Sequence, residues 1–585
     1  PKVLQQHIKP QWQARHLMST PVKSVFAADS VAEAHQILSR YNINAIPVLS
    51  KDEVVGIISR QLVDKAVYHG LQEQPVSEIM TSDFQQVEPQ TSVALLKMLF
   101  VESNQRFAPV VEGGRLVGAI TRTDLLRHLA SSVGTPTRSG ETNLVNRGGR
   151  RYRAGQIQRL IRNRLPKRIQ DLLTQLGQVA DELDLKVFVV GGFVRDLLMN
   201  KNNLDLDVVV EGDGVAFAEA FALQNDCRVR CHHKFGTAVL IFPDDFKIDV
   251  ASARMEYYLR PGALPDVEHA SVKMDLSRRD FTINTLAISL NQDAYGSLFD
   301  YYGGQRDIDD KVLRVLHNLS FVEDPTRVFR AVRFEQRLGF QIGKQTEHLL
   351  NSAVRLGLME KVSGHRVFSE LFLILNEPQP LPAVSRLARL DVLRQIHPKL
   401  TSKIDYSRSF DEARRTTDWY DLLYTGQPCE RWFCYFLVFT AILDREEITN
   451  LSERLQLIPR YHDMLSQQRS TALGILKRLE SRPEGMRQPK SSSLYRWFKP
   501  LSTEILLFMM ARTSQDLVRQ WISHYITHLR DAQPLLTGHD LATMGFQPGP
   551  VYREILDTLL YARLDGRVVS VEDERELVEK KFLSG

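Results

Sequence analysis

Two aspartates separated by one residue, Asp205 and Asp207, are the strongest candidates in this sequence for metal-binding side chains. In a β-strand, residues two apart point to the same face, so a strand over 204–210 would project both carboxylates side by side. Two carboxylates that close repel each other unless a cation lies between them. Hard oxygen ligands favour Mg²⁺, bound as one or two ions in phosphoryl and nucleotidyl transfer. The spacing therefore predicts a magnesium site.

A glycine turn lies just upstream of the two aspartates. Residues 187–190 form an apolar, β-branched run that predicts a buried strand, and Gly191 and Gly192 end it. We expect a helix over 193–199, whose free N–H groups would face an anion. Arg195 would add a donor fork suited to phosphate. A lone glycine pair is a weak signal, and a lone Asp-x-Asp is usually surface charge. Here the two motifs occur together, at a spacing that would direct both to the same place.

The combined pattern GGFVRDLL and LDLDVVVEGDG resembles the catalytic head of the nucleotidyltransferase superfamily. It is most similar to the class II tRNA nucleotidyltransferases, which include CCA-adding enzymes, A-adding enzymes and bacterial poly(A) polymerases. The resemblance covers roughly residues 156–580 and is strongest over 187–340. It implies attack of an RNA 3′-hydroxyl on the α-phosphorus of a nucleoside triphosphate, with Mg²⁺ held by Asp205 and Asp207.

Further acidic and basic residues extend the expected site. Asp249, in FKIDVA, is a candidate third carboxylate that positions or deprotonates the attacking hydroxyl, although a solvated strand-end acid is the alternative. In the block LSRRDFTINTL the resemblance implies that Arg279 reaches the triphosphate and that Asp280 accepts hydrogen bonds from ribose hydroxyls. Asn284 lies one helical turn beyond Asp280 and would face the same way. An ordinary charged helix is the alternative for this block.

Residues 253–276 predict little regular structure and resemble the flexible loop that moves when such enzymes switch from adding C to adding A. Relatives that add only CC lack a working version of this loop. Here it is present, with Arg254, Glu256 and Tyr257.

Residues 322–340 predict a helix on which an acid and three arginines recur every three residues: Asp324, Arg327, Arg330 and Arg333. A solvated charged face is the common explanation for such a row, but the block resembles the family's amino-acid template for nucleotide choice. A carboxylate accepts from the exocyclic amine of C or A, and an adjacent Arg donates to the ring nitrogen. G and U would leave a buried polar group unpaired, at about 1–3 kcal/mol. Asp324 and Arg327 are the expected pair, with Arg330 and Arg333 contacting phosphate or RNA.

The first 130 residues contain an internal repeat. Pro47 matches Pro109 and Gly56 matches Gly118, both offset by 62 residues, and the repeat resembles a tandem CBS module. Such pairs often bind AMP or ATP through a Gly-x-x-[Ser/Thr]-x-x-Asp pattern. The second copy keeps it as Gly118, Thr121 and Asp124, whereas Leu62 replaces the Asp in the first. A scaffold or dimerisation module without a ligand is an equal alternative, and CBS pairs commonly form homo-oligomers.

The sequence thus predicts a multidomain α/β plus α protein. We expect a tandem CBS (α/β) module over 1–130, a linker over 131–155, and a nucleotidyltransferase head with a mixed β-sheet over 156–320, begun by a helix over 157–183. A helical neck over 321–380 and a helical body and tail over 381–585 would hold the tRNA 3′ acceptor end by shape and phosphates. Cys227, Cys231, His232 and His233 do not match zinc spacings, and His539-Asp540 is interpreted as structural.

Composition limits the setting. The chain has 585 residues, 43% hydrophobic and 25% charged, with a net charge of +5 and a pI near 8.8, which permits a nucleic-acid partner. No run is long and apolar enough to predict a membrane span, and four cysteines indicate a reducing, cytoplasmic setting. The chain begins with Pro1. Relatives with CBS pairs often carry a DHH-type phosphoesterase domain ahead of them, and a start without Met would suit the removal of such a domain; the sequence leaves open whether one has been removed.

Nucleotide specificity is the most open expectation. The domain order and the variants EGDG and PGALP resemble enzymes that add only the terminal A, using ATP, after a separate enzyme has added CC. The Asp–Arg pair accepts both bases, so CC or CCA addition with CTP stays open. Poly(A) polymerase is another alternative, although its relatives favour a KDFD-like block. An adenine-nucleotide-sensing regulatory protein built on the CBS pair is an alternative of a different class.

Overall fold

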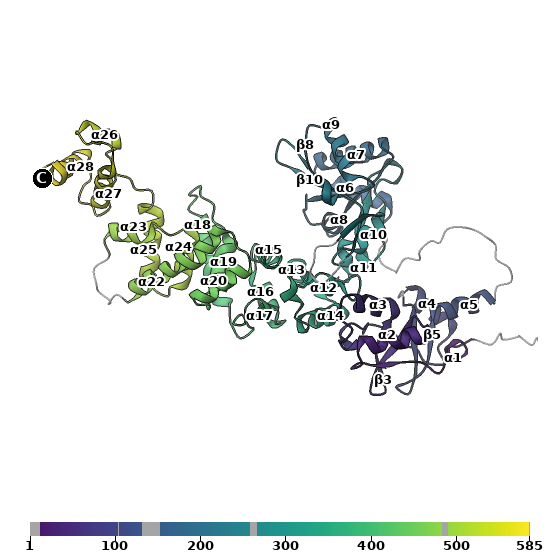
Figure 1. Ribbon diagram of the computed structural model, residues 1–585. Helices are drawn as coiled ribbons and strands as arrows, with labels where there is room; N and C mark the ends of the chain where they lie inside the picture. Colours follow the sequence, from purple (N-terminus) through teal and green to yellow (C-terminus); the bar gives the residue numbers. More distant parts are fainter. Residues whose placement is uncertain (1–11, 103–104, 132–151, 258–265, 482–488, 584–585) are drawn as a thin grey trace, which may run out of the picture. The chain divides into compact units, whose positions relative to one another are not determined.

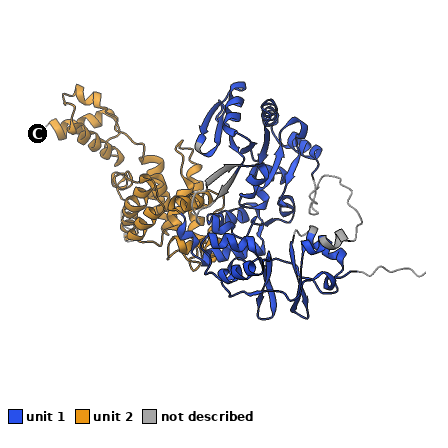
Figure 2. Ribbon diagram, turned by 45° about the vertical axis from the view of Figure 1, so that its right-hand side comes forward, with its two compact units in different colours: residues 1–362 blue, residues 363–585 orange. Residues whose placement is uncertain are grey.

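A computed structural model of the chain describes residues 12–102, 105–131, 152–257, 266–481 and 489–583. The chain divides into two compact units, residues 1–362 and 363–585 (Figure 2). Much of the predicted linker over 131–155 lies outside the described residues. Among the described residues, no helix has both the length and the apolar character needed to cross a membrane. All four cysteines are free.

The N-terminal repeat folds as two copies of one pattern. The first comprises α1 (Ala14–Leu17), β1 (Val25–Phe26), α2 (Val31–Arg40), β2 (Ala45–Ser50), β3 (Glu53–Ser59) and α3 (Arg60–Tyr68). The second comprises η1 (Val76–Glu78), α4 (Val93–Glu102), β4 (Phe107–Glu112), β5 (Arg115–Thr121) and α5 (Arg122–Ser131). The β2–β3 and β4–β5 hairpins share one register, with Pro47 opposite Ile57 and Pro109 opposite Ala119. The predicted repeat is confirmed.

The head is built on a mixed seven-stranded sheet of order β14-β13-β6-β7-β10-β9-β8, in which β7 and β10 are parallel. Its strands are β6 (Lys186–Val190), β7 (Leu206–Glu211), β8 (Arg228–His232), β9 (Thr237–Ile241), β10 (Lys247–Ser252), β13 (Leu286–Ser289) and β14 (Leu298–Asp300). Its helices are α6 (Ala154–Arg164), α7 (Lys167–Glu182), α8 (Gly192–Leu198), α9 (Gly214–Gln224), α10 (Val272–Ser277) and α11 (Gly304–Asp309), with short turns η2 (His233–Phe235), η3 (Thr282–Asn284) and η4 (Gln292–Ala294). The predicted mixed sheet is confirmed.

Alternation along β6 and β7 separates the two faces of this sheet. Val187 and Val189 lie in the main core with α6, α7 and α9 (Figure 1), whereas Phe188 and Val190 lie in a smaller core with α10. Asp207 is two residues before Val209, which belongs to the smaller core, so its side chain leaves the sheet on that face. The sequence predicted one helix over 157–183. The structure instead has two, because Pro166 starts α7 and the residue before a proline is biased away from helical geometry.

The neck follows the head through β15 (Val312–Leu313), α12 (Ser320–Glu323), α13 (Arg327–Leu338), β16 (Gln341–Ile342), α14 (Lys344–Arg355) and η5 (Leu358–Lys361). β15 and β16 pair in parallel. The expectation of an entirely helical region from about residue 340 is therefore wrong only at this short strand. α12 and α13 position the residues predicted to select the nucleotide.

The second unit is helical throughout its described residues. Its helices are α15 (Gly364–Leu375), α16 (Leu381–Arg389), α17 (Val392–Ile396), α18 (Ser407–Asp421), α19 (Arg431–Phe439), α20 (Arg445–Arg454), α21 (Pro459–Asp463), η6 (Met464–Gln468), α22 (Arg469–Glu480), α23 (Ser491–Phe498), α24 (Thr503–Arg512), α25 (Asp516–His524), η7 (Tyr525–Leu529), α26 (Gly538–Thr543), α27 (Pro550–Leu564), α28 (Val571–Val578) and η8 (Glu579–Leu583). Aromatic packing holds its centre, where Phe410 and Tyr435 stack at 5.3 Å between ring centroids. Asp540 accepts from the Thr537 backbone and hydroxyl and so caps the start of α26.

Candidate functional site

Three aspartates gather at the ends of the two parallel strands of the head. Asp207 lies in β7 and its Cα is paired with that of Asp249 in β10, so the two side chains leave the same face of the sheet. Asp205 immediately precedes β7. Asp205 and Asp249 are exposed, and Asp207 is half-buried. The sequence thus predicted the neighbourhood of Asp205 and Asp207 locally, while the sheet brings Asp249 to them.

The electrostatics of this group fit a cation. Burial raises the pKa of Asp207 to about 6; Arg279 opposes this shift, and the charges of Asp205 and Asp249 add to it. Burial and Asp205 also raise the pKa of Asp249. The carboxylates therefore repel one another in the absence of a metal, and a divalent cation among them would relieve that repulsion. The donor set consists of the hard oxygens that Mg²⁺ prefers.

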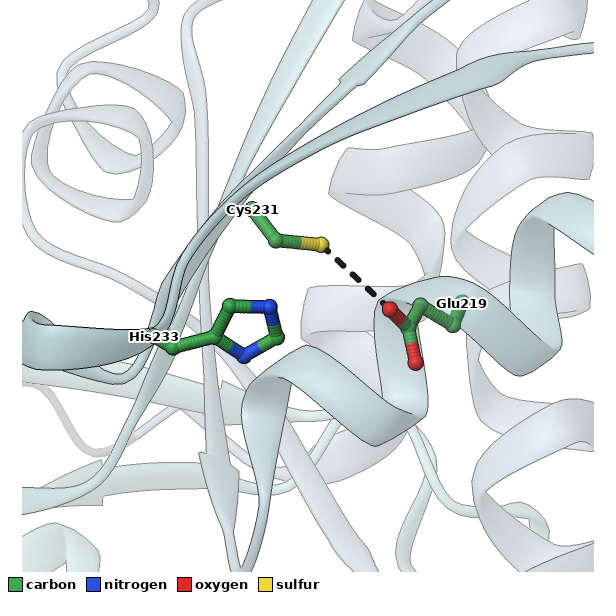
Figure 3. A group of neighbouring side chains, drawn as sticks. All are labelled: Glu219, Cys231 and His233. Atoms are coloured by element: carbon green, nitrogen blue, oxygen red, sulfur yellow. Dashed lines mark hydrogen bonds between the residues drawn. The ribbon is translucent and has the colours of Figure 1, made fainter.

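A different group has the tightest arrangement of possible metal ligands among the described residues. Glu219 on α9, Cys231 on β8 and His233 on η2 place one ligand atom each within 4.8 Å of one another (Figure 3). Cys231 Sγ lies 3.7 Å from Glu219 Oε1, and burial followed by the Glu219 charge raises the pKa of the thiol. Structural zinc sites use four protein ligands, and this group is largely exposed. The expectation that the Cys/His segment is no zinc site stays a prediction.

The glycine turn brings the backbone against the charged centre. Gly191 has φ of 73°, and a Cβ there would lie 2.6 Å from Nη1 of Arg279 and 3.7 Å from Oδ2 of Asp207. A side chain at this position would therefore be strained and would displace Arg279. The helix after the turn is α8, which begins at Gly192, one residue earlier than predicted.

The guanidinium group of Arg195 is already hydrogen-bonded within the protein. It is 3% exposed, its Nε and Nη2 donate to Asp196, and its Nη1 donates to Asn284 Oδ1 at 2.7 Å. The structure therefore ties the predicted phosphate donor into a buried network. It still borders the cavity described below, next to Gly192.

Asp280, predicted to accept hydrogen bonds from ribose hydroxyls, is bonded to several protein groups. Its Oδ1 accepts from the backbone N–H of Phe281 and from Nδ2 of Asn284, and its Oδ2 accepts from Nε and Nη2 of Arg330. Burial alone would raise the pKa of Asp280, but Arg330 and Asn284 lower it to about 2. The structure therefore makes Asp280 the anchor of Arg330, which was predicted to contact phosphate or RNA. Asn284 faces Asp280 as expected, from η3 rather than from an α-helix.

The predicted single helix over 322–340 is wrong at Pro325. α12 ends at Glu323, Asp324 is extended with φ of −134° and ψ of 94°, and α13 begins at Arg327. Proline disfavours helical geometry in the residue before it, so Asp324 is released from the helix. Its Oδ1 accepts from the N–H and hydroxyl of Thr326. Arg327, 4% exposed, donates to Ser320 Oγ and to the Arg278 carbonyl, each at 2.6 Å.

One cavity of about 450 Å³ unites most of these side chains. Its lining is dominated by arginines and aspartates: Arg195, Arg278, Arg279, Arg327, Arg330, Arg333 and Arg337 with Asp205, Asp207, Asp280 and Asp324. Gly192, Asn203, Asn284 and Phe334 complete it, whereas Gly191 and Asp249 are outside the lining. The cationic lining suits a triphosphate, with carboxylates for a metal and an Asp–Arg pair for a base.

Sequence reasoning missed several of these residues. The guanidinium groups of Arg195, Arg330 and Arg333 lie over the ring of Phe334 at 5.3, 5.5 and 5.0 Å from its centroid. Fully buried Asp275 accepts from Arg278 and Arg279. The arginine at 278 was readable as the neighbour of Arg279. The roles of Phe334 and Asp275 carried no local signal, because their partners lie in other elements.

The predicted flexible loop contains regular structure. β11 (Arg254–Tyr257) and β12 (Asp266–His269) form an antiparallel hairpin, and α10 follows, so the expectation of irregular structure is wrong at these segments. Arg254 donates to the Phe235 carbonyl at 3.0 Å. The side chains of Glu256 and Tyr257, and residues 258–265, lie outside the described residues.

The CBS pair encloses a second cavity, of about 1040 Å³, lined by both repeats. Thr121 and Asp124 border it, and the Thr121 hydroxyl donates to Asp124 Oδ2 at 2.6 Å. Gly118 does not border it; a Cβ there would lie 2.4 Å from Met18 Sδ, as a Cβ at Gly56 would from Met80 Sδ. Packing against methionine thus explains both glycines of the repeat.

Comparisons with known proteins agree with these observations. Residues 187–314 match the family described as "Poly A polymerase head domain", residues 14–68 and 76–131 match "CBS domain", and residues 339–404 match "Probable RNA and SrmB- binding site of polymerase A". An A-adding tRNA nucleotidyltransferase of Geobacter sulfurreducens is 46% identical over 98% of this chain, which spans 65% of that relative's length. One of Halalkalibacterium halodurans is 30% identical over 74% of this chain and 97% of its own length.

A solved structure shares the fold. The Thermotoga maritima CCA-adding enzyme complexed with tRNA has a TM-score of 0.55 and 33% identity over 72% of this chain and 98% of its own.

Proposed function

Since the chain belongs to the tRNA nucleotidyltransferase family, we propose that it adds the terminal A to tRNA ending in CC. The observation that carries this proposal is the head cavity, which combines carboxylates, a set of arginines and the Asp324–Arg327 pair in one space. The A-adding relative that aligns with 98% of this chain supports addition of A alone. The acceptor would be the tRNA 3′ end and the donor ATP, with CC added beforehand by a separate enzyme.

Nucleotidyltransferases of this family are metal-dependent. We infer that Asp205 and Asp207 hold Mg²⁺ and that Asp249 supports the attacking 3′-hydroxyl. When bound, Mg²⁺ neutralises charge on the triphosphate and on the attacking oxygen. The half-burial of Asp207 and the mutual repulsion of the three carboxylates favour this assignment.

The arginines would hold the triphosphate. Arg279 lies against Gly191, and its charge acts on the nearby Asp207 carboxylate. Asp275 accepts hydrogen bonds from Arg278 and Arg279 and so orients both guanidinium groups. Asp280 does the same for Arg330. Held guanidinium groups lose little freedom when they bind phosphate, and positioning of this kind supplies most of the rate in phosphoryl transfer.

Asp324 and Arg327 would read the base. The break at Pro325 leaves the Asp324 carboxylate beside the first turn of α13, where Arg327 begins the helix. One acceptor next to one donor admits A and C and rejects G and U, with no nucleic-acid template. Addition of CC or CCA is the variant of this proposal that the pair also permits.

A second function is favoured by the cavity of about 1040 Å³ between the CBS repeats. We propose that it binds an adenine nucleotide such as AMP or ATP, with Asp124 accepting from ribose hydroxyls. Apolar side chains including Ile46 and Phe107 border the same space, which suits a base.

A gel assay with three tRNA transcripts tests the main proposal. The transcripts end in the discriminator base, in C, or in CC, and each receives CTP alone, ATP alone, or both. Extension only of the CC-ended transcript, by one A, is the expected result. Extension of all three to CCA would identify a complete CCA-adding enzyme, extension stopping at CC a CC-adding enzyme, and long A tails a poly(A) polymerase. No extension with any transcript would contradict the proposal.

A further inference from the structure

The CBS module contacts the neck through several polar bonds. Asn318 Nδ2 donates to the Ile79 carbonyl at 2.9 Å, and Gln345 Oε1 accepts from the Ser82 N–H at 2.7 Å. Arg355 on α14 pairs with Glu78 at 2.7 Å. These contacts join residues more than 230 positions apart, so the CBS module and the neck share one polar interface within the first unit.

Glu323 lies at the end of this interface nearest the base-selecting pair. Its carboxylate is 3.2 Å from His317 of the neck, and 3.9 and 3.8 Å from His69 and Lys65 of the CBS module. The Glu323 side chain is 13% exposed and that of His69 only 4%. Burial alone would raise the pKa of Glu323, but His317 and His69 lower it. An acidic side chain this buried needs such polar and charged partners to remain ionised.

Glu323 directly precedes Asp324, so its contacts act on the part of the chain that carries the base-selecting carboxylate. Glu323 is the last residue of α12, and Asp324 follows in the extended bend before Pro325. The N–H of Asp324 closes the last turn of α12 on the Ser320 carbonyl at 3.2 Å, and its side chain accepts from Thr326. The contacts of Glu323 therefore hold the end of α12 from which the Asp324 carboxylate projects.

The CBS side of the contact leads to the second cavity. Lys65 and His69 lie on and just after α3, and Arg60, Asp64 and Lys65 of the same helix line the cavity between the repeats. Lys65 thus borders the cavity and lies within ion-pair distance of Glu323. The contact between Lys65 and Glu323 joins α3 to α12, which lie close together in Figure 1.

We propose that Glu323 is a positioning residue for the base-selecting carboxylate Asp324, and that the CBS module supplies part of its support through His69 and Lys65. This inference rests on the proposed function of the head cavity. It assigns the CBS module a role in nucleotide choice. One helix, α3, both lines the CBS cavity and contacts the residue that positions Asp324.

The test compares Glu323→Gln, Glu323→Ala and His69→Ala with Arg355→Ala in the full chain. Arg355→Ala is the matched control because it removes another charged contact between the same two parts, away from Asp324. Steady-state kinetics with CC-ended tRNA would measure KM for ATP, kcat, and the preference for ATP over GTP. We expect Glu323→Gln to raise KM for ATP roughly tenfold with kcat within about threefold, because misplaced base contacts weaken ATP binding in the ground state and the transition state alike.

The expected order is Glu323→Ala, then Glu323→Gln, then His69→Ala, with Arg355→Ala within about twofold of wild type. Because Glu323 and His69 act through one contact, the double variant His69→Ala/Glu323→Gln should be no worse than Glu323→Gln. Equal effects of Glu323→Ala and Arg355→Ala would overturn the proposal, as would an unchanged KM and base preference in Glu323→Ala.

A second measurement keeps the inference separate from the proposed activity. Hydrogen–deuterium exchange of peptides covering residues 319–330 reports whether the bend is held, with or without catalysis. Faster exchange there in Glu323→Gln and His69→Ala, but not in Arg355→Ala, is expected. If the wild type adds no A, the proposed function fails while exchange still decides the inference. Unchanged exchange in both variants would overturn it.

Discussion

The head cavity and the CBS cavity hold their polar side chains differently. In the head cavity, charged groups are bound to one another before any ligand arrives: Arg330 to Asp280, and Arg195 to Asp196 and Asn284. The CBS cavity is more than twice as large and mixes apolar and polar side chains, with Asp124 held by its neighbour Thr121. The head cavity thus suits a highly charged ligand. The CBS cavity suits a ligand with an apolar portion.

The two CBS repeats differ in a similar way. Both have the same hairpin register and the same glycine packed against a methionine. The second keeps the Thr–Asp pair, whereas the first has Leu62 there and directs the end of α3 toward Glu323. The two copies therefore share their backbone geometry and differ in the side chains at these positions.

The largest expected effect is a loss of activity at the head cavity with no change in ligand binding at the CBS cavity. Asp205→Ala and Asp207→Ala should each lower the rate of nucleotide addition by roughly a thousandfold or more, because a bound metal supplies several kcal/mol to such a reaction. Primer-extension assays would measure this loss, and calorimetry with AMP should show an unchanged CBS ligand site. Asp171→Ala, an exposed aspartate on α7, is the control. Full activity in both variants would contradict the metal assignment.

Removing Asp324 should act on nucleotide choice. Asp324→Ala should raise KM for ATP by about 10- to 100-fold and reduce discrimination against GTP, because a base amine loses its acceptor at about 1–3 kcal/mol. Competition between ATP and GTP on CC-ended tRNA measures the change. A variant that loses kcat alone, with base preference intact, would count against a base-reading role for Asp324.

Substitution of Asp280 tests whether its ion pair with Arg330 stabilises the head in the absence of a ligand. Its pKa in the folded protein is about 2, below the ordinary value of 3.8. Its stabilisation is therefore fully present above about pH 4 and is lost as the pH falls toward 2. Asp280→Asn should cost about 2 kcal/mol of unfolding free energy at pH 7. Urea unfolding of both proteins should show this difference constant from pH 7 to 5 and shrinking below pH 4; a pH-independent difference would exclude the ion pair as its source.

The smallest expected effect concerns the CBS cavity. Asp124→Ala should weaken AMP or ATP binding there about tenfold, the loss of roughly one charge-assisted hydrogen bond, while nucleotide addition on CC-ended tRNA changes less than about twofold. Calorimetry measures the affinity, with Asp64→Ala of the first repeat as the comparison. Equal losses in both variants would show that the repeats have not diverged as ligand sites, and unchanged binding in Asp124→Ala would remove the Thr–Asp pair from the site.

Short-range patterns were enough to predict the main elements of this protein. The apolar run at 187–190, the glycine turn, Asp205 and Asp207 lie within about twenty consecutive residues, so strand periodicity alone places them together. The CBS repeat was readable for the same reason, because its two copies share one spacing of strands and glycines. Locally encoded geometry needs no knowledge of the rest of the chain.

Only the tertiary structure decided which distant charges meet. Asp280 and Arg330 are 50 residues apart, and Arg195 and Asn284 are 89 apart, yet each pair is bonded, the first half-buried and the second buried. Sequence assigned these side chains to ligands, because an isolated motif shows a donor or an acceptor but not its partner. The cost of burying an unpaired charge forces such groups to pair wherever folding brings them together. For the same reason Glu323, between a neck histidine and the CBS module, had no signal in the sequence.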